Sequence, residues 1–334
     1  MTNTLRIGVL GCSSIARRRT LPAMRTVPKA VLSAVASRSI EKAKQFATEF
    51  DTVATSYEGL IDGDDVDAVY ISLPNGLHHE WAARALRAGK HVLCEKPLTT
   101  TAAEAERLAA IATEHNLVLR ENFTFLHHPQ HARVRELLDA GRIGSPRTFA
   151  AAFCIPPLPA GDIRHDGGLG GGALLDVGVY PLRATQLLFG SDLRVVGATL
   201  RVDETLGVDL AGQVLLVTAD GVFANLEFGF QHSYRSRYSL WGSSAGLSVD
   251  RAFTPPASWQ PTLRIEEQNH TEELVLAPAD QFGLSVGSFT DAALAGRDAA
   301  VESAWLSSSV ANARLVDEIV RTAVHVPTSD SVGQ

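Results

Sequence analysis

The chain has 334 residues, of which 45% are hydrophobic and 20% charged, and 30 basic against 37 acidic side chains leave a net charge of −7. This balance excludes an intrinsically disordered chain, which would need fewer apolar residues and more net charge. It also argues against a nucleic-acid or anionic-membrane partner, because neither attracts an acidic protein. Chains beyond about 250–300 residues usually divide, so we expect two domains.

The three cysteines, Cys12, Cys94 and Cys154, are too few and too scattered for a disulfide framework, and none forms a CxxC pair. We expect them to be buried thiols in a reducing compartment. No run reaches the about 18 apolar residues of a membrane span, and the N-terminal residues enter a strand-like run without room for a signal peptide. These features favour a cytoplasmic protein without a membrane partner.

In the first 120 residues, short apolar runs alternate with helical patterns. The expected strands are Leu5–Leu10, Val31–Ala36, Ala68–Leu73, His91–Cys94 and Leu117–Arg120. The expected helices are Ile40–Phe50, His78–Ala88 and Ala102–His115. Such alternation produces parallel strand pairs joined by right-handed crossovers. Residues 1–122 are therefore predicted to form an α/β dinucleotide-binding domain, a Rossmann fold with a doubly wound parallel sheet.

After Asn122 the pattern changes. The expected helices are His131–Ala140, Leu174–Phe189, Gln281–Ala295 and Ala304–Val320. The expected strands are Thr148–Ile155, Val214–Thr218, Val222–Phe228 and Leu247–Val249, the middle two forming a hairpin around an Asp-Gly turn. Residues 123–334 are predicted to form a substrate-binding α+β domain with a mostly antiparallel open sheet, and we expect the closing helix 304–320 to pack back on the first domain.

A glycine-containing turn follows the first strand and opens a helix, where a dinucleotide fold places its phosphate-binding loop. Aligned on the pattern G-x-G-x-x-G/A, the segment Gly11-Cys12-Ser13-Ser14-Ile15-Ala16 puts Gly11, Ser13 and Ala16 at the key positions. Gly11 permits the tight turn, and Ala16 lets the helix pack on the strand. Ser13 replaces the second glycine, but it is small and can donate a hydrogen bond. With the helix N-terminal amides, this turn is predicted to bind a pyrophosphate.

The end of the second strand indicates which dinucleotide binds. NAD sites usually carry Asp or Glu about 20 residues after the glycines, to bond the ribose 2′-hydroxyl. Here Ser37 and Arg38 take that place, and they can bond a 2′-phosphate. NADP is therefore the predicted cofactor, with an ordinary polar loop as the alternative. The run Arg17-Arg18-Arg19 is either a solvated basic turn or supplies one or two side chains to diphosphate groups, since its members point in different directions.

One further segment, Glu95-Lys96-Pro97, follows the strand His91–Cys94. Open parallel sheets gather ligands at the carboxyl ends of their strands. Pro97 keeps Lys96 out of the α region, so the backbone fixes the direction of the lysine side chain. Glu95 can hold or tune the ammonium group. The segment therefore predicts a catalytic lysine, against the alternative of a surface charge.

A second segment follows the glycine run at residues 170–172, where Asp176 and Tyr180 are spaced four apart on one face of the expected helix. A carboxylate and a phenol that project together suggest ligand binding and proton transfer. The alternative is an aspartate favoured by the helix dipole and a half-buried tyrosine, which the spacing does not exclude.

Together these motifs resemble the glucose–fructose oxidoreductase/inositol dehydrogenase/rhizopine-catabolism family. The resemblance covers essentially the whole chain and rests on the altered turn, the Glu-Lys-Pro segment and Gly-Gly-Gly-x-Leu-x-Asp-x-Gly at residues 170–178. Many members carry His in place of Tyr180, and the Tyr variant is similar to glucose–fructose oxidoreductases, dihydrodiol dehydrogenases and sugar 3-ketoreductases. Residues 11–22, 121–128 and 162–164 look most like NDP-hexose 3-ketoreductases of deoxysugar biosynthesis in antibiotic-producing actinomycetes.

The resemblance implies an oxidoreductase acting on CH–OH, which uses NADPH to reduce the C-3 ketone of a dTDP-linked 3,4-diketo-2,6-dideoxyhexose. Hydride from nicotinamide C4 attacks the ketone carbon while an acid protonates the oxygen. The family's lysine maps to Lys96 and its tyrosine to Tyr180. Both side chains carry a proton at neutral pH. We assign Lys96 as proton donor and Tyr180 as its hydrogen-bonded partner on the substrate, and the opposite assignment stays open.

Other site residues are carried over from the resemblance. Those expected to bind the cofactor are Gly11, Cys12, Ser13, Ser14, Ile15, Ala16, Arg17, Arg18, Ser37, Arg38, Tyr57, Leu73, Pro74, Asn75, His78, Glu95, Arg164 and Asp176. Those expected to bind the nucleotide sugar are Arg19, Lys96, Asp176, Tyr180, Tyr234 and Thr254. Tyr234 would stack on thymine, with a core tyrosine on a strand as the alternative. His127 and His128 are not assigned to a metal, because no carboxylate or Cys follows with ligand spacing.

Two rival functions use the same scaffold. The first is an NADP-dependent dehydrogenase of a free sugar or dihydrodiol. The second is a non-catalytic NADP-binding regulator, against which the presence of both Lys96 and Tyr180 argues, since a sensor needs no proton donor. Family members are commonly dimers or tetramers, so a homodimer or homotetramer is expected, and an exposed face of the second-domain sheet would suit self-association.

Overall fold

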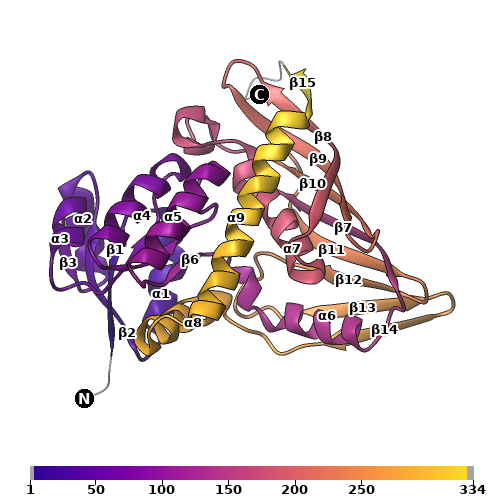
Figure 1. The fold of residues 1–334 in the computed structure, drawn as a ribbon, viewed down its shortest axis with the longest axis horizontal. Helices are drawn as coiled ribbons and strands as arrows, with labels where there is room; N and C mark the ends of the chain where they lie inside the picture. Colours follow the sequence, from indigo (N-terminus) through magenta and orange to yellow (C-terminus); the bar gives the residue numbers. More distant parts are fainter. Residues whose placement is uncertain (1–3, 329–334) are drawn as a thin grey trace. The chain divides into compact units, whose positions relative to one another are not determined.

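The computed structural model describes residues 4–328, which form two compact units (Figure 1). Unit 1 takes the chain as far as Thr124 and then Gln281–Val310, and unit 2 holds Phe125–Asp280 and the chain from Ala311. The division falls within the long helix α9 (Ala299–Thr322). Across residues 4–328, no helix is both long enough and apolar enough to cross a bilayer.

Unit 1 contains a six-stranded sheet in the order β3-β2-β1-β4-β5-β6. Every neighbouring pair in it is parallel. The strands are β1 (Leu5–Leu10), β2 (Ala30–Ala36), β3 (Val53–Thr55), β4 (Ala68–Ile71), β5 (His91–Cys94) and β6 (Leu119–Glu121). This order confirms the predicted Rossmann fold, with its topological switch between β1 and β4.

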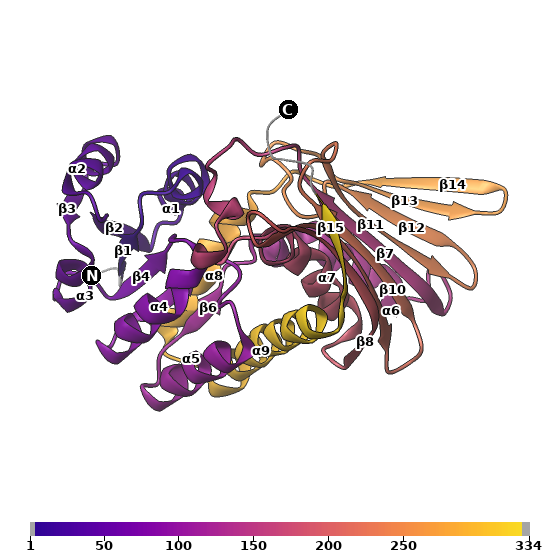
Figure 2. The same ribbon diagram turned by 90° about the horizontal axis from the view of Figure 1, so that it is seen from above.

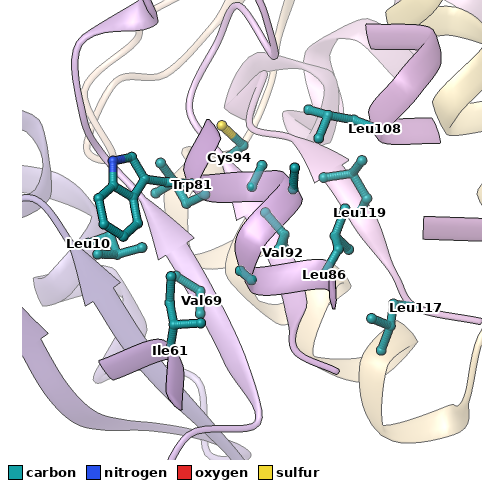
Figure 3. Packing of buried hydrophobic residues seen from close by; sticks show 14 of the residues in the cluster. Leu10, Ile61, Val69, Trp81, Leu86, Val92, Cys94, Leu108, Leu117 and Leu119 are labelled. Atoms are coloured by element: carbon teal, nitrogen blue, oxygen red, sulfur yellow. The ribbon is translucent and has the colours of Figure 1, made fainter. Parts of the chain in front are cut away.

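Helices cover both faces of this sheet. Its strands are largely apolar because side chains on both faces are buried beneath those helices. The helices of unit 1 are α1 (Leu21–Met24), α2 (Ile40–Glu49), α3 (Tyr57–Asp62), α4 (His78–Arg87), α5 (Ala102–Glu114) and α8 (Gln281–Ala295). Ser39, Ser56 and Thr101 cap α2, α3 and α5, each by accepting a hydrogen bond from a first-turn amide. Figure 3 shows the core on one face, where Trp81 and Leu86 of α4 pack with Val69 and Val92.

The other face of the sheet explains why residues 281–310 belong to unit 1. Val286, Phe289 and Ala293 of α8 pack in one core with Ile7 of β1 and Tyr70 of β4. This differs from the sequence-based boundary, which placed the whole chain after residue 122 in the second domain. Helix α8 was predicted at its observed bounds, but periodicity does not say which sheet a helix covers.

Unit 2 contains a nine-stranded sheet in the order β14-β13-β12-β11-β7-β10-β9-β8-β15. The strands are β7 (Pro146–Cys154), β8 (Leu193–Asp203), β9 (Val208–Thr218), β10 (Phe223–Gly229), β11 (Arg235–Gly242), β12 (Gly246–Asp250), β13 (Thr262–Glu267), β14 (His270–Val275) and β15 (Val324–Thr328). Within the described part of this nine-stranded sheet, only the pairs β7–β10 and β8–β15 are parallel. The predicted mostly antiparallel open sheet is therefore confirmed.

The predicted hairpin joins β9 to β10, with Gly221 at φ +79° in its turn. Residues along β9 and β10 alternate between buried and more exposed, as in a sheet with one solvated face. Figure 2 shows α7 (Val179–Phe189) against one face of this sheet. Helix α6 (Pro129–Asp139) contacts β11 through the hydrogen bond between His131 and Tyr238. In unit 2, sequence patterns missed β8, the first half of β9, β13, β14 and β15.

A buried ion pair joins two distant parts of unit 1. Arg120 of β6 donates to both carboxylate oxygens of Glu302 on α9, at 2.5 and 3.2 Å, and the two side chains are 6% and 2% exposed. Arg120 also donates to Ser288 of α8 at 2.8 Å, and its guanidinium lies 5.1 Å from the ring centroid of Trp305. This network anchors α8 and the first half of α9 to the edge strand β6.

Glu302→Ala should lower the free energy of unfolding by about 3–5 kcal/mol, because it leaves Arg120 as a buried charge without its partner. Glu136→Ala, which breaks the exposed Arg133–Glu136 pair, should cost less than about 1 kcal/mol. Urea unfolding of both variants measures the difference. Equal losses would contradict the expectation, and the apolar pair Arg120→Met with Glu302→Leu should recover most of the stability.

Candidate active site

The turn after β1 lies against the end of β4. Gly11 adopts φ +100°, and a Cβ at this position would stand 2.4 Å from the carbonyl oxygen of Ser72. The Gly11 amide donates to the Ala36 carbonyl of β2 at 3.0 Å. Only glycine meets both requirements, a positive φ and a backbone neighbour this close.

Ser13 makes a bond that no glycine could make at this position. Its hydroxyl hydrogen-bonds that of Ser72 and also accepts from the Ala16 amide at 3.1 Å, so it caps the helix that follows. Cys12 and Ala16 are buried, whereas Ser14 and Ile15 are exposed on the first turn. The helix start therefore keeps its small residues inward and its amide end open, as an anion site requires.

The residues predicted to select the dinucleotide lie at the end of β2. Arg38 is exposed and Ser37 half-buried. The Arg38 amide donates to the Tyr57 hydroxyl, and burial, the largest influence, raises the pKa of that tyrosine. Tyr57 packs edge-on against Trp81, with ring centroids 4.9 Å apart. The structure thus brings Ser37, Arg38 and Tyr57 together, and no carboxylate occupies the position that favours NAD.

The three arginines after the turn are exposed and point to different surroundings. Arg17 pairs with Glu49 of α2 at 2.8 Å, and its guanidinium lies 5.9 Å from the ring centroid of Phe46. The Nε of Arg18 donates to the Ser14 carbonyl at 3.4 Å. The structure thus gives Arg17 a partner within the protein, on the side of the turn that faces α2.

The loop after β4 is joined to the segment after Lys96 by a buried histidine. The Nδ1 of His78 lies 2.7 Å from the Pro97 carbonyl, and Nε2 lies 2.9 Å from the Leu73 carbonyl. The ring is fully buried, which lowers its pKa. Pro74 and Asn75 are half-buried beside it. Both ring nitrogens of His78 lie within hydrogen-bond distance of a backbone carbonyl, so the ring donates to one of them when neutral and to both when protonated. Its place in the site is to hold two loops together.

Glu95 lies in a polar cluster at the end of β5. Its Oε1 accepts from the Tyr70 hydroxyl and from Asn122 Nδ2, each at 2.7 Å. Burial is the largest influence on the carboxyl group and raises its pKa, while Tyr70, Asn122 and Lys96 act in the opposite direction. Lys96 is half-buried next to it. The strand end thus presents a lysine whose neighbour is held by two donated hydrogen bonds.

In unit 2, Arg164 and Asp176 form an ion pair, with Nε donating to Oδ2 at 2.7 Å. Asp176 is the largest of the influences that raise the pKa of Arg164. A Cβ on Gly171 would stand 2.5 Å from the Arg164 carbonyl, and the Gly172 amide donates to that carbonyl at 2.9 Å. The glycine run therefore lets the Arg164 segment lie directly against the start of the helix.

Tyr180 is half-buried in an aromatic cluster of unit 2. Its ring centroid lies 4.9 Å from that of Phe153, 5.8 Å from Phe125 and 5.7 Å from Phe253. The expected single helix is a π-helical turn, Leu174–Gly178, followed by α7 from Val179. Asp176 is therefore in the π-helical turn and Tyr180 in α7, which continues the turn without a break. That the two side chains project together stays a prediction.

Two residues carried over for the nucleotide sugar meet on the surface of unit 2. The Tyr234 hydroxyl lies 2.6 Å from the Thr254 hydroxyl, and Tyr234 is 40% exposed. The guanidinium of Arg251 lies 4.8 Å from the centroid of the Tyr234 ring and 5.7 Å from that of Trp259. Tyr234 is therefore a surface tyrosine with a cation over its face, and the alternative of a core tyrosine is wrong.

One half-buried carboxylate was missed by the sequence analysis. Asp209 of β9 accepts from the Leu174 amide at 2.7 Å, at the start of the turn that carries Asp176. Burial raises its pKa to about 6, although hydrogen bonds from backbone amides oppose the shift. A Cβ on Gly172 would stand 2.4 Å from Asp209 Oδ1. The carboxylate thus anchors the glycine run to the sheet.

Two family models match this chain. The first, an oxidoreductase family with an NAD-binding Rossmann fold, matches residues 5–123, and the second, the GFO/IDH/MocA C-terminal domain, matches residues 131–248. The chain belongs to the GFO/IDH/MocA oxidoreductase family. This confirms the resemblance inferred from the motifs.

Individual relatives span nearly the whole chain. A dTDP-3,4-didehydro-2,6-dideoxy-alpha-D-glucose 3-reductase from Actinomadura kijaniata is 50% identical over 318 residues, 95% of each chain. A crystal structure of a 3-ketoreductase from the same organism, in complex with NADP and TDP-benzene, covers 98% of this chain and 100% of its own with a TM-score of 0.94 and 49% identity. A D-xylose 1-dehydrogenase (NADP(+)) from Haloferax volcanii is 32% identical over 95% of this chain and 96% of its own.

The sequence analysis missed several residues that contact the predicted site residues. Tyr70 carried a signal, because a tyrosine in a fully buried strand needs a hydrogen-bond partner for its hydroxyl. Asn122 stood in a segment already singled out, whereas Ser72 and Asp209 carried no local signal. Of the histidines considered for metal binding, His128 caps α6 by accepting from the Gln130 amide at 3.2 Å. Within residues 4–328 no three His, Cys, Asp or Glu side chains form a metal-binding group.

The pH dependence of unfolding should report the raised pKa of Asp209. Its pKa of about 6 in the folded protein lies above the ordinary 3.8, so the folded state binds the proton more tightly. Stability from this group is therefore greatest near pH 4 and declines as pH rises through 6. Relative to Asp209→Asn, the wild-type protein should lose about 2.4 kcal/mol of unfolding free energy between pH 4 and pH 7.

Asp203→Asn provides the control of opposite sign. The Thr205 hydroxyl donates to Asp203 at 2.6 Å and holds the pKa of that carboxyl below its usual value. Stability from Asp203 is present above its unfolded pKa and is lost as pH falls. Unfolding free energies at about pH 3, 4, 5.5 and 7 measure both slopes, because Asp203 acts below about pH 4 and Asp209 above it. A wild-type minus Asp209→Asn difference that is flat with pH would contradict the raised pKa of Asp209.

Proposed function

We propose that this protein uses NADPH to reduce the C-3 ketone of a dTDP-linked 3,4-diketo-2,6-dideoxyhexose. The observation that carries the proposal is the match, over 98% of this chain, to a 3-ketoreductase solved with NADP and TDP-benzene. Relatives at 50% identity from Actinomadura kijaniata and Saccharopolyspora spinosa carry the corresponding 3-reductase name. The finer context, a deoxysugar pathway of antibiotic biosynthesis in the cytoplasm, is part of the proposal.

The residues of unit 1 fit an NADP cofactor. The contact between Gly11 and Ser72 brings backbone close to where a pyrophosphate would sit, and the helix start at residues 13–15 would offer its amides. Ser37 and Arg38 would hold the 2′-phosphate, with Tyr57 bonded to the Arg38 amide next to them. Leu73, Pro74 and Asn75 would border the nicotinamide half, and His78 would support them. When bound, NADPH supplies the hydride for the ketone carbon.

The remaining chemistry falls to side chains of this chain. A ketone that accepts a hydride at carbon needs a proton at oxygen to become the alcohol, and Lys96 is the proposed donor. Tyr180 would hydrogen-bond the same oxygen. Two single variants of the Actinomadura kijaniata enzyme have been crystallised with NADP and TDP-benzene. In one a tyrosine is changed to phenylalanine, and in the other a lysine is changed to alanine. Those two positions are separated by the same number of residues as Lys96 and Tyr180, which supports the assignment.

Other contacts are proposed for the substrate. Arg164 and Asp176 form a pre-paired donor and acceptor beside the glycine run, suited to the sugar or the cofactor amide. Tyr234 and Thr254, joined by their hydroxyls, would face the thymine, and the exposed Arg19 would reach the diphosphate. An aromatic face can stack on a base while a hydroxyl bonds its edge.

We further propose a homodimer or homotetramer. The nine-stranded sheet has a hollow of about 790 Å³ on one face, lined by residues such as Gln213, Asn225 and Val324. Val324 is 65% exposed and Trp241 63% exposed in the same sheet. Apolar side chains this exposed on a sheet favour association with another copy.

Two rival functions remain distinguishable by experiment. A dehydrogenase of a free sugar is represented by the Haloferax volcanii relative, at lower identity than the 3-reductases. A non-catalytic regulator would bind NADPH without turnover. Cofactor binding does not separate the three, whereas turnover with defined substrates does.

NADPH oxidation should be followed by absorbance with the dTDP-3,4-diketo sugar, generated in place by a partner dehydratase. We expect NADPH to be consumed with this substrate. We expect no reduction of NADP⁺ when glucose or a dihydrodiol is supplied instead. Lys96→Ala should lower kcat by about 10²–10⁴-fold while NADPH still binds, because a positioned proton donor contributes that much. Tyr180→Phe should retain more activity than Lys96→Ala.

The outcomes separate the functions. Oxidation of free sugar without reduction of the nucleotide sugar would move the protein to the dehydrogenases. Silence with every substrate, with NADPH still bound, would favour the regulator. Full activity in Lys96→Ala would remove the lysine from the mechanism, and a larger loss in Tyr180→Phe would make the tyrosine the donor.

Arg38→Asp should weaken NADPH binding by about ten- to a hundredfold and leave NADH binding nearly unchanged, because only NADPH carries the 2′-phosphate. Arg25→Asp, at the C-terminal end of α1, makes the same change in net charge just before the start of β2, whereas Arg38 follows the end of that strand, and it is the control. Cofactor dissociation constants measured by fluorescence test both. Equal losses for NADPH and NADH would overturn the assignment of Arg38.

A further inference from the structure

A chain of side-chain hydrogen bonds converges on Glu95, the residue before Lys96. Its Oε1 accepts from the Tyr70 hydroxyl and from Asn122 Nδ2, each at 2.7 Å. Tyr70 belongs to β4, and Asn122 follows β6 directly. The two donors thus come from the strands on either side of β5, at whose end Glu95 lies.

Each of these donors has a further partner that fixes its orientation. Ser285 of α8 donates to Asn122 Oδ1 at 2.7 Å, which turns the amide so that its NH₂ group faces Glu95. Thr20, in the helix after the phosphate-binding turn, lies 3.0 Å from the Tyr70 hydroxyl. Because the single hydrogen of Tyr70 is given to Glu95, Thr20 donates to Tyr70.

The polar groups of this hydrogen-bond chain are buried, so they must find their partners within the protein. Thr20 and Tyr70 are fully buried, and Asn122 and Ser285 are each 3% exposed. Water therefore cannot replace a missing partner, and each bond that is lost leaves a buried polar group unsatisfied. The Glu95 carboxylate also accepts from the backbone amide of Lys96. The same carboxylate thus joins the hydrogen-bond chain to the main chain of the lysine.

We propose that Tyr70 and Asn122 are positioning residues that hold the Glu95 carboxylate and, through it, Lys96 in the orientation for proton transfer. Ser285 and Thr20 extend this device to α8 and to the helix of the phosphate-binding turn. The proposal rests on the proposed function only in that Lys96 is the proton donor. It assigns a role to four buried residues outside the set proposed to contact the substrate or the cofactor.

The device has an electrostatic consequence. The titratable groups around Glu95 are Tyr70 on β4 and Lys96 and Cys94 in its own segment, while Glu121 of β6 acts on Cys94. Asn122 and Ser285 add neutral donors. The two donated bonds stabilise the ionised carboxylate against a burial that raises its pKa. Removal of either donor raises that pKa further and weakens the charge beside Lys96.

Tyr70→Phe removes the hydroxyl and leaves the ring packed. Ser285→Ala is the milder second variant, and Ser288→Ala is its matched control. Both serines are in α8 and each makes one side-chain hydrogen bond. The bond of Ser285 is buried, whereas Ser288 is half-buried, accepts from Arg120 at 2.8 Å and is not bonded to Glu95 or to its two donors. The control therefore costs a comparable bond without changing the environment of the carboxylate.

The first readout is the melting temperature of the cofactor-free protein at pH 5 and pH 8. The deficit of Tyr70→Phe relative to wild type should be larger at pH 8, because the lost donor matters most when Glu95 is ionised. Ser285→Ala should show the same trend more weakly, and Ser288→Ala an equal deficit at both pH values. Equal deficits for Tyr70→Phe and Ser285→Ala at both pH values would overturn the proposal.

The second readout is the pH profile of the reductase. In Tyr70→Phe, kcat should fall about tenfold with KM for NADPH nearly unchanged, and the acidic limb of kcat/KM should move to higher pH. An unshifted limb would overturn the positioning of Lys96 even with altered melting. If the wild-type protein reduces no nucleotide sugar, the proposed function fails, and the melting comparison still decides whether the chain of bonds controls Glu95.

Discussion

The close approach of Gly11 to the Ser72 carbonyl is the contact on which the nucleotide half of the site depends. It follows from the strand order, because β1 and β4 are neighbours whose chains leave the sheet in opposite directions. A side chain at position 11 would separate the two strand ends. With hydrogen there, Ser13 reaches Ser72, the helix begins at the right place, and the loop from Leu73 lies beside the turn. One missing Cβ therefore sets the geometry of two loops.

The lysine segment next to this turn follows a second rule, that buried polar groups must find partners inside the protein. His78 is fully buried and Glu95 half-buried, and each connects the end of β5 to its surroundings. Glu95 does so through side chains of β4 and of the residue after β6, and His78 through two backbone carbonyls. In unit 2, Asp209 and Asp176 hold the glycine run in place, Asp209 by accepting from the Leu174 amide and Asp176 by pairing with Arg164. The reactive residues thus stand on segments held by polar contacts.

Much of the fold could be predicted from local patterns. The parallel strands of unit 1 are short, apolar and bounded by turn residues, and the Asp-Gly turn defined the hairpin of β9 and β10. Strand β8 was missed because its buried positions do not alternate regularly, so its pattern is weak. Helix α8 was found, but its attachment to unit 1 depends on Val286 and Phe289 reaching the β1 core, a docking that helical periodicity does not encode.

The sequence by itself determined the chemistry at single positions: the glycine of the turn, the absence of a carboxylate at Ser37 and Arg38, the lysine before Pro97, and the tyrosine of α7. Only the tertiary structure decided which distant residues serve them. Asn122 and Ser285 meet near Glu95, Asp209 meets Leu174, and Arg17 is paired with Glu49. These contacts depend on strand order, register and helix docking. Such quantities arise from packing across the whole chain, so no local pattern of residues contains them.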